Sequence, residues 1–326
     1  MSPVCPHGLL SARLCESLEG IRIRPGSTWR ATVHGRTVTA DSAAALHAPL
    51  TRTLYDVLHA GRREDTARTR SLRDPRLEEQ LTNATPHRTT VAHARIIGTA
   101  DGSRETVLEL SGVRVWAPTA MVRAFGQATG ADGTVAVELP AARPALSPGF
   151  FLADGSLGRP GNAGLLRFYL HIHDPACAPA AWHQALSRLE NERICYRAKI
   201  LCAPRSYPRT DAMVVYLGPD AWHLAADMPQ ILGDLPGTAP ATSVFTRRLA
   251  PGTAMAWEPA DHRPGHAYLS FGQHRSDALA GALIAHAGDP AAHSLDTRVR
   301  QSLVRAGVDP LAPERNTDSP EPEHNR

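Results

Sequence analysis

The side chains best suited to chemistry gather within residues 148–286. The stretch 166–173 alternates apolar and polar residues, so strand geometry gives it one core face and one polar face. The polar face would carry Arg167, Tyr169, His171 and His173. Because histidine titrates near neutral pH, it serves readily as a general acid or base, and His171 is our first candidate.

A second predicted strand, residues 194–201, follows a helix over 180–192 and sends Arg197 and Lys199 to its polar side. A strand–helix–strand unit favours parallel, adjacent strands, so we expect Lys199 to lie beside His171. A lysine acts as a base only when uncharged, so its surroundings must favour the neutral amine.

Several arginines lie beside turns and aromatic residues. Arg209 follows Tyr207 in APRSYPRTDAMVVYLG, Arg247 and Arg248 lie in FTRRLAPG, and Arg275 in SFGQHR precedes a predicted helix. A guanidinium offers a planar donor fork for phosphate, and helix N-termini favour anions. The arginines therefore predict an anion clamp.

Each of these residues also has an ordinary structural interpretation. Lys199 fits a solvated strand-edge lysine, His171 a satisfied histidine, and the arginines a solvated surface, with Arg248 as a structural partner of Asp211.

Imidazole and thiolate side chains raise the question of a metal. His171 and His173 with Cys177 or His183 would suit zinc, which defines a rival interpretation as a metal-dependent hydrolase. The spacing matches no familiar ligand set, and we expect neither metal nor organic cofactor. The five cysteines are odd in number and lack C-x-x-C pairs, which predicts reduced thiols.

A glycine-rich stretch begins at Gly149 and leads into the first strand. It lacks the G-x-x-x-x-G-K-[ST] pattern and precedes a strand rather than a helix, which excludes a nucleotide-binding loop. We expect a mobile loop over a cleft.

The elements that position these side chains predict an α+β fold. The N-terminal part should be largely helical, with a helix over 43–58, strands over 106–116 and 134–139, and a helix over 118–127. The catalytic part should be built on a mixed β-sheet. The expected division is residues 1–145 packed on the core, 146–290 as the core, and 291–326 as a C-terminal helix with a disordered tail.

Composition limits the function. The net charge of +3 lacks the strong excess expected of a nucleic-acid-binding protein, and no apolar run is long enough to span a membrane. The N-terminus lacks signal-peptide features, which predicts a cytoplasmic protein.

Residues 149–283 resemble the HopA-like type III effector family. The motifs, in family order, are GFFLADGS, RFYLHI, RAKILCAPRSYPRTDAMVVYLG, FTRRLAPG and SFGQHR, with LYDVLH upstream. Related proteins of class V lanthipeptide and thioamitide pathways look like phosphoserine and phosphothreonine lyases, which implies a phosphothreonine-lyase-like fold.

The resemblance implies roles for individual residues. Lys199 would be the base that removes the Cα proton, and His171 the acid that protonates the departing phosphate. Arg209, Arg248 and Arg275 would lead in binding phosphate, with Arg247 an alternative to Arg248. Tyr207 would orient the peptide.

One position departs from the pattern. Phosphothreonine lyases carry a lysine two residues before the acid histidine, where this chain has Tyr169. Arg167 or Arg197 would replace the missing cation, and we count Tyr169 and Arg167 among the candidate substrate-binding residues.

The implied partners are a phosphorylated precursor peptide and a separate peptide kinase. A catalytically silent HopA-like adaptor, which would bind the peptide or its kinase, is the alternative.

Overall fold

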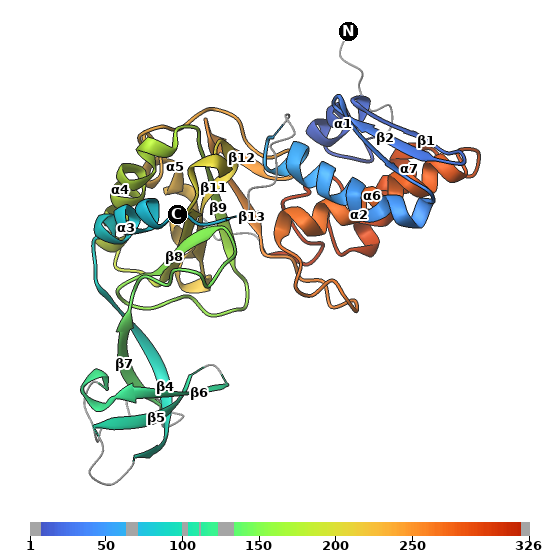
Figure 1. Ribbon diagram of the computed structural model, residues 1–326. Coiled ribbons are helices and arrows are strands. Elements are labelled where there is room, and N and C mark those ends of the chain that lie inside the picture. The colour runs from blue at the N-terminus through green and yellow to red at the C-terminus, as the bar shows by residue number, and fades with distance from the viewer. Residues whose placement is uncertain (1–7, 63–70, 100–103, 111, 123–133, 321–326) are drawn as a thin grey trace.

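The computed structural model describes residues 8–62, 71–99, 104–110, 112–122 and 134–320 (Figure 1). Its centre is a six-stranded sheet in the order β12-β13-β9-β11-β10-β8, and every neighbouring pair is antiparallel. The strands are β8 (Phe150–Asp154), β9 (Leu166–Ile172), β10 (Tyr196–Leu201), β11 (Arg209–Leu217), β12 (Arg247–Ala250) and β13 (Thr253–Trp257). The expected α+β class is confirmed, but the sheet of the core, expected to be mixed, is wholly antiparallel.

Strand β11 separates the two strands that were expected to be neighbours. β9 and β10 each pair antiparallel with β11, so the prediction that they are adjacent is wrong. All nine residues of β11 are buried. Because such a strand is covered on both faces, it takes a central position in the sheet.

One face of this sheet is closed by helices. α3 (Pro75–Ala84), α4 (Ala178–Asn191), η5 (Pro219–Ala226) and α5 (Met228–Ile231) pack there. Alternate strand residues such as Phe168, Ala198 and Val215 join Trp182 of α4 in this core.

A second core lies against part of the opposite face. It joins α1 (Ala12–Glu19), α2 (Ala43–Leu54), α6 (Phe271–Gly288) and α7 (Leu295–Arg305) to the small sheet β1 (Ile21–Arg24), β2 (Trp29–Val33) and β3 (Arg36–Ala40). Figure 1 shows these N- and C-terminal elements side by side. The N-terminal part is therefore less helical than expected.

Local sequence explains where the helices of this second core begin. Ser42 caps α2 by accepting a hydrogen bond from the Ala45 amide. Ser270 and Gln273 form a capping box at the start of α6. After α2 the chain continues as a π-helical turn, η1 (Tyr55–His59), and the expected helix over 43–58 is present with this change of winding.

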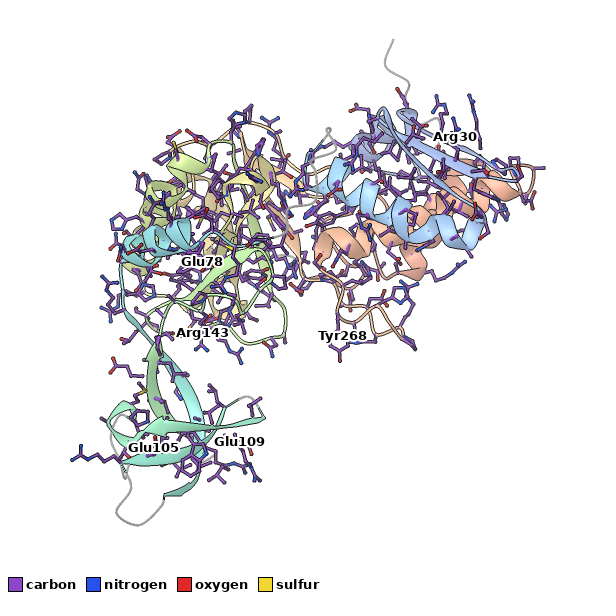
Figure 2. All side chains as sticks on the ribbon, in the orientation of Figure 1. Arg30, Glu78, Glu105, Glu109, Arg143 and Tyr268 are labelled. Carbon is purple, nitrogen blue, oxygen red and sulfur yellow. The ribbon has the colours of Figure 1, made fainter. Side chains whose placement is uncertain are left out.

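A four-stranded sheet projects from the body (Figure 1). It contains β4 (Thr89–Thr99), β5 (Glu105–Leu110), β6 (Val113–Pro118) and β7 (Val135–Pro140). The short η2 (Thr119–Met121) follows β6. Figure 2 shows Glu105 and Glu109 on this sheet, whereas Arg143 lies where it joins the body and pairs with Asp154 at 3.0 Å.

Two expectations for this region change. The single strand over 106–116 is two strands, because Gly112 turns the chain with φ +79°. Of the expected helix over 118–127, the described residues contain only η2, and residues 123–127 lie outside the described part.

The C-terminal segment is ordered by contacts rather than by a core of its own. The Trp257 amide donates to the Glu314 carbonyl at 2.8 Å, and Asn316 donates to the Glu258 carbonyl at 2.8 Å. The expectation of a disordered tail is wrong up to Pro320, and residues 321–326 lie outside the described part.

The cysteines follow the prediction in part. Cys177, Cys195 and Cys202 are free thiols. Cys15 is disulfide-bonded, so the expectation of reduced thiols throughout is wrong. The division into residues 1–145, 146–290 and 291–326 stays a prediction.

Candidate functional site

The candidate site lies on the face of the six-stranded sheet opposite α4. Strand register places Lys199, Val214 and Tyr169 in one cross-strand row. Arg197, Tyr216 and Arg167 form the next row on the same face. Because neighbouring strands lie about 4.8 Å apart, Lys199 and Tyr169 are two strand spacings from each other.

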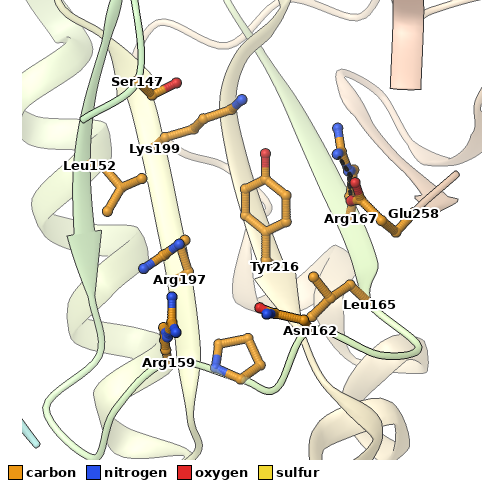
Figure 3. A pocket seen from close by; sticks show the side chains of 11 residues that line it. Ser147, Leu152, Arg159, Asn162, Leu165, Arg167, Arg197, Lys199, Tyr216 and Glu258 are labelled. Atoms are coloured by element: carbon orange, nitrogen blue, oxygen red, sulfur yellow. Dashed lines mark hydrogen bonds and ion pairs between the residues drawn. The ribbon is translucent and has the colours of Figure 1, made fainter. Parts of the chain in front are cut away.

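A cavity of about 200 Å³ opens on the second row and on Lys199 of the first (Figure 3). The glycine-rich stretch, expected to lie over a cleft, contributes Arg159, Pro160 and Asn162 to its wall. The other lining residues are Ser147, Leu152, Leu165, Arg167, Arg197, Lys199, Tyr216 and Glu258.

Two of the guanidinium groups in this cavity are already neutralised. Arg197 donates from Nε to Asp154 Oδ1 at 2.6 Å and from Nη2 to Asp154 Oδ2 at 3.1 Å. Arg167 makes a short bidentate pair with Glu258 and also lies 5.1 Å from the Tyr216 ring. These arginines shape the wall more than they add free positive charge.

Lys199 differs from them. Its Nζ lies 4.4 Å from the centre of the Phe150 ring and 5.7 Å from that of Tyr216, and within the described residues it has no ion pair or hydrogen bond. Lys199 is also the one lysine of the whole sequence, in which all other basic residues among the 35 are arginines. Arginine keeps its proton in proteins, whereas lysine can lose one, so this position holds the single such amine side chain.

Arg209 lies close to Lys199 at the same aromatic ring. Its Cζ is 5.7 Å from the centre of the Phe150 ring and 5.6 Å from that of Tyr55. It donates from Nε to Asp211 Oδ1 at 2.6 Å, and from Nη2 to Asp211 Oδ2 at 2.5 Å and to the Tyr55 hydroxyl at 2.6 Å. Nη1 makes no hydrogen bond with the part of the chain that the structure describes.

Burial and charge set the ionisation of this cluster. Burial would lower the pKa of Arg209, but Asp211 and Tyr55 raise it above its ordinary value. Burial would raise the pKa of Asp211, but Arg209 holds it well below its ordinary value. Both groups are therefore charged at neutral pH.

His59 closes the buried side of the cluster. Its Nε2 lies 3.6 Å from Asp211 Oδ2, and its Nδ1 is 2.9 Å from the Ser243 hydroxyl. Burial lowers the pKa of His59 to about 4, so its ring is neutral at pH 7.

His171 lies on the same face of β9 and is half-buried. Burial lowers its pKa, while the negative charge of Asp211 acts in the opposite direction. Its buried Nδ1 has no partner among the described residues, whereas the hydroxyl of Tyr169, two residues before it, lies near the Arg167 guanidinium. Unpartnered buried polar atoms cost free energy, and in native structures they often mark a functional site.

The remaining predicted residues lie elsewhere. Arg275 is fully buried inside α6, where its donors reach the Pro313 carbonyl at 2.8 Å and the Asn316 side chain at 3.1 Å. It lies at the fifth residue of α6, so the expected anion site at the helix start is not formed by this side chain. Tyr207 is buried and donates to the Leu201 carbonyl at 2.8 Å.

Arg247 and Arg248 lie exposed on β12, the edge strand of the sheet. Arg248 makes no ion pair with Asp211, and Asp211 pairs with Arg209 instead. The structure thus places Lys199, Arg167, Arg209, Tyr169 and His171 on one face of the sheet, where Lys199 and Arg167 line the cavity and the other three lie beyond its lining. The other four predicted residues lie apart from this face.

Several residues of this cluster were not predicted from the sequence. Tyr55 and His59 belong to LYDVLH, a motif for which the sequence predicts no role. Phe150, Tyr216 and Glu258 were also missed. Strand alternation would have placed Tyr216 on the polar face, and the uniqueness of Lys199 was a further available signal.

A metal site finds no support in the described residues, which contain no group of three or more His, Cys, Asp and Glu side chains placed to hold a metal ion. His173, the proposed second ligand, is exposed. In the same residues no helix is both long and apolar enough to cross a membrane.

The fold and site define an α+β protein with a cavity lined by Lys199, three arginines and Tyr216 on a six-stranded antiparallel sheet. A model of the HopA1 effector protein family matches residues 141–315, and the chain belongs to this family. The match contains the whole six-stranded sheet but not Tyr55 or His59.

Two solved structures are similar to the chain. An effector protein from Pseudomonas syringae pv. tomato strain DC3000 has a TM-score of 0.46 and 14% identity, over 84% of this chain and 90% of that chain. An effector protein from Pseudomonas syringae pv. syringae strain 61 has a TM-score of 0.44 and 11% identity, over 84% of this chain and 97% of that chain. No curated protein matches the sequence.

Proposed function

We propose that this protein is a phosphoserine or phosphothreonine lyase. It eliminates phosphate from a precursor peptide that a separate kinase has phosphorylated, in a lanthipeptide-type pathway. The observation that carries the proposal is Lys199, the chain's one lysine. Its amine has no ion pair or hydrogen bond with the described part of the chain and lines a cavity on the face that also bears His171 and Arg209.

The reaction needs a base at Cα and an acid at the leaving oxygen. The neutral amine of Lys199 removes the Cα proton, and the electrons of that C–H bond form the Cα=Cβ bond. The Cβ–O bond breaks, and the phosphate leaves with its bonding pair and takes a proton from His171. Phosphoserine gives dehydroalanine, and phosphothreonine gives dehydrobutyrine.

Arg209 suits the binding of the leaving group. Its charged guanidinium lies near Phe150, as Lys199 does, and attracts the phosphate dianion. Arg209 Nη1 is the donor that Asp211 and Tyr55 leave for the substrate. Arg248 and Arg247, exposed on β12, would act on parts of the peptide farther from the phosphate.

The acid must gain a proton before the phosphate leaves. Burial lowers the pKa of His171 in the free protein, so the ring is neutral when the site is empty of substrate. A phosphate dianion beside it favours the protonated ring. The substrate thus prepares its own acid.

Mass spectrometry of a phosphothreonine peptide incubated with the full chain in chelator, then treated with a thiol, tests the proposal. Loss of phosphoric acid followed by thiol addition is the expected result. Loss of the phosphoryl group alone, leaving the hydroxyl, would establish a phosphatase. An unchanged peptide that still binds would indicate the adaptor.

A further inference from the structure

The segment after η1 runs along the start of β11, next to Arg209 and Asp211. The Thr210 amide donates to the Ala60 carbonyl at 3.1 Å, and the Thr210 hydroxyl donates to the His59 carbonyl. This pairing fixes a part of the N-terminal region against the strand that carries Arg209.

Gly61 lets the chain turn at this point. Its φ is +73°, and an added Cβ would lie 3.0 Å from Thr210 Cγ2, so a side chain there would be both strained and crowded. The Arg62 amide then donates to the Asp56 carbonyl at 2.7 Å. The backbone therefore holds Arg62 close to the Arg209 and Asp211 pair.

The Arg62 side chain lacks the partners that usually satisfy a half-buried arginine. Within the described residues it makes no hydrogen bond or ion pair. The two carboxylates whose charge acts on Arg62 already have partners. Asp211 accepts from Arg209 and Tyr55, and Asp56 is paired with Arg36 at 3.4 Å. Burial and the neighbouring charge of Arg209 both lower the pKa of Arg62.

Positive charge is thus concentrated around one aromatic ring. Lys199 and Arg209 both lie over Phe150, and the backbone hydrogen bonds at Ala60 and Arg62 hold the Arg62 segment next to the strand that carries Arg209. Holding like charges together costs free energy, which a bound anion offsets. Such an arrangement fits a phosphate monoester.

We propose that Arg62 is a phosphate-binding residue that completes the site from the N-terminal side. The proposal rests on the lyase function proposed above and deepens it, because it names a further residue of the phosphate site. Arg62 lies outside the family match over residues 141–315. The phosphate site is then built from two parts of the chain, Arg209 from the sheet and Arg62 from the segment that follows η1.

Affinity measurements on the full chain test this assignment. We compare Arg62→Ala and Arg62→Lys with the wild type, using fluorescence anisotropy of one labelled peptide in its phosphothreonine and threonine forms. Arg62→Ala should weaken binding of the phosphorylated form by about 10-fold or more, the usual loss for a charge-assisted hydrogen bond. Binding of the threonine form should not change, and Arg62→Lys should fall between.

Arg52→Ala is the matched control. Arg52 is an exposed arginine on α2, ten positions before Arg62 in the sequence. Its replacement should leave both affinities unchanged. Melting curves of all variants show whether each is folded. Arg62→Lys, which keeps the charge and most of the packing, decides the matter if Arg62→Ala does not fold.

The outcomes separate this inference from the lyase proposal. Elimination by the wild type with unchanged phosphopeptide affinity in Arg62→Ala would overturn the inference alone. A wild type that binds the phosphopeptide without eliminating phosphate would overturn the lyase, and the Arg62→Ala comparison would still support or overturn the phosphate contact. A wild type with no preference for the phosphorylated form would overturn both.

Discussion

Arg209 and Asp211 bind each other two residues apart on one strand, with Arg209 Nε 2.6 Å from Asp211 Oδ1 and Nη2 2.5 Å from Oδ2. Both side chains are largely buried, and the hydroxyl of Tyr55 joins the pair. The carboxylate thus fixes two of the three guanidinium nitrogens and directs the third. The Arg209 guanidinium is held in the orientation that would position a phosphate only while the Asp211 carboxylate is charged.

Asp211→Asn should destabilise the fold and not only the site. The change leaves a buried guanidinium without a carboxylate, so we expect the free energy of unfolding to fall by about 3–5 kcal/mol. Urea denaturation measures this value. Asp56→Asn is the control, because its more exposed pair with Arg36 should contribute less than about 1 kcal/mol. Equal losses in both variants would contradict the argument.

Lys199→Arg should separate charge from basicity. Arginine keeps the positive charge but does not give up its proton, so phosphopeptide affinity should stay close to the wild type while elimination is lost. We expect kcat to fall by about 10²–10⁴-fold, the usual contribution of a general base. Single-turnover mass spectrometry measures this rate. Elimination at the wild-type rate would assign the base to another group.

The sequence predicted the faces of the strands better than their order. Alternation placed Lys199 on β10 and His171 on β9 with their polar neighbours, because residue type depends on which face a strand buries. The order of strands depends on contacts between distant segments. Residues 213–217 read simply as an apolar strand, and nothing local showed that β11 lies between the other two.

The arginines show a second limit of the sequence. Arg209 and Arg275 both follow aromatic or turn residues, and both read as anion ligands. The structure gives Arg275 partners from residues 313–316, almost forty positions farther on, and leaves one nitrogen of Arg209 unused. Long-range partners decide whether an arginine is free, and spacing does not reveal them.

Arg275→Lys should therefore reduce stability and spare phosphopeptide affinity. The lysine would lose the donors to the Pro313 carbonyl and the Asn316 side chain, which hold the C-terminal segment against α6. Each hydrogen bond from a charged group contributes about 1.5–3 kcal/mol, so the loss should exceed about 2 kcal/mol. Calorimetric unfolding gives the stability, and anisotropy the affinity. Weakened phosphopeptide binding in a variant of normal stability would contradict this prediction and assign Arg275 to the phosphate site.

Acid should destabilise the protein between pH 6.5 and 4. Burial lowers the pKa of His59 to about 4 and that of His274 to about 4, whereas both rings titrate near 6.5 when unfolded. The unfolded chain therefore binds more protons in this interval, so stability is fully present above about pH 6.5 and is lost as the pH falls toward 4. Each ring should contribute a slope of up to about 1.4 kcal/mol per pH unit.

Urea denaturation at half-unit steps from pH 7.5 to 4.5 measures this slope. His59→Gln removes one of the two rings while keeping a polar side chain that reaches Ser243, so the variant should lose about half of the slope even if its stability at pH 7.5 is lower. Stability that stays level down to pH 5 would mean that the two histidines are not buried in their neutral form. It would also argue against the packing of η1 on β11, since His59 lies 3.6 Å from Asp211 only in that arrangement.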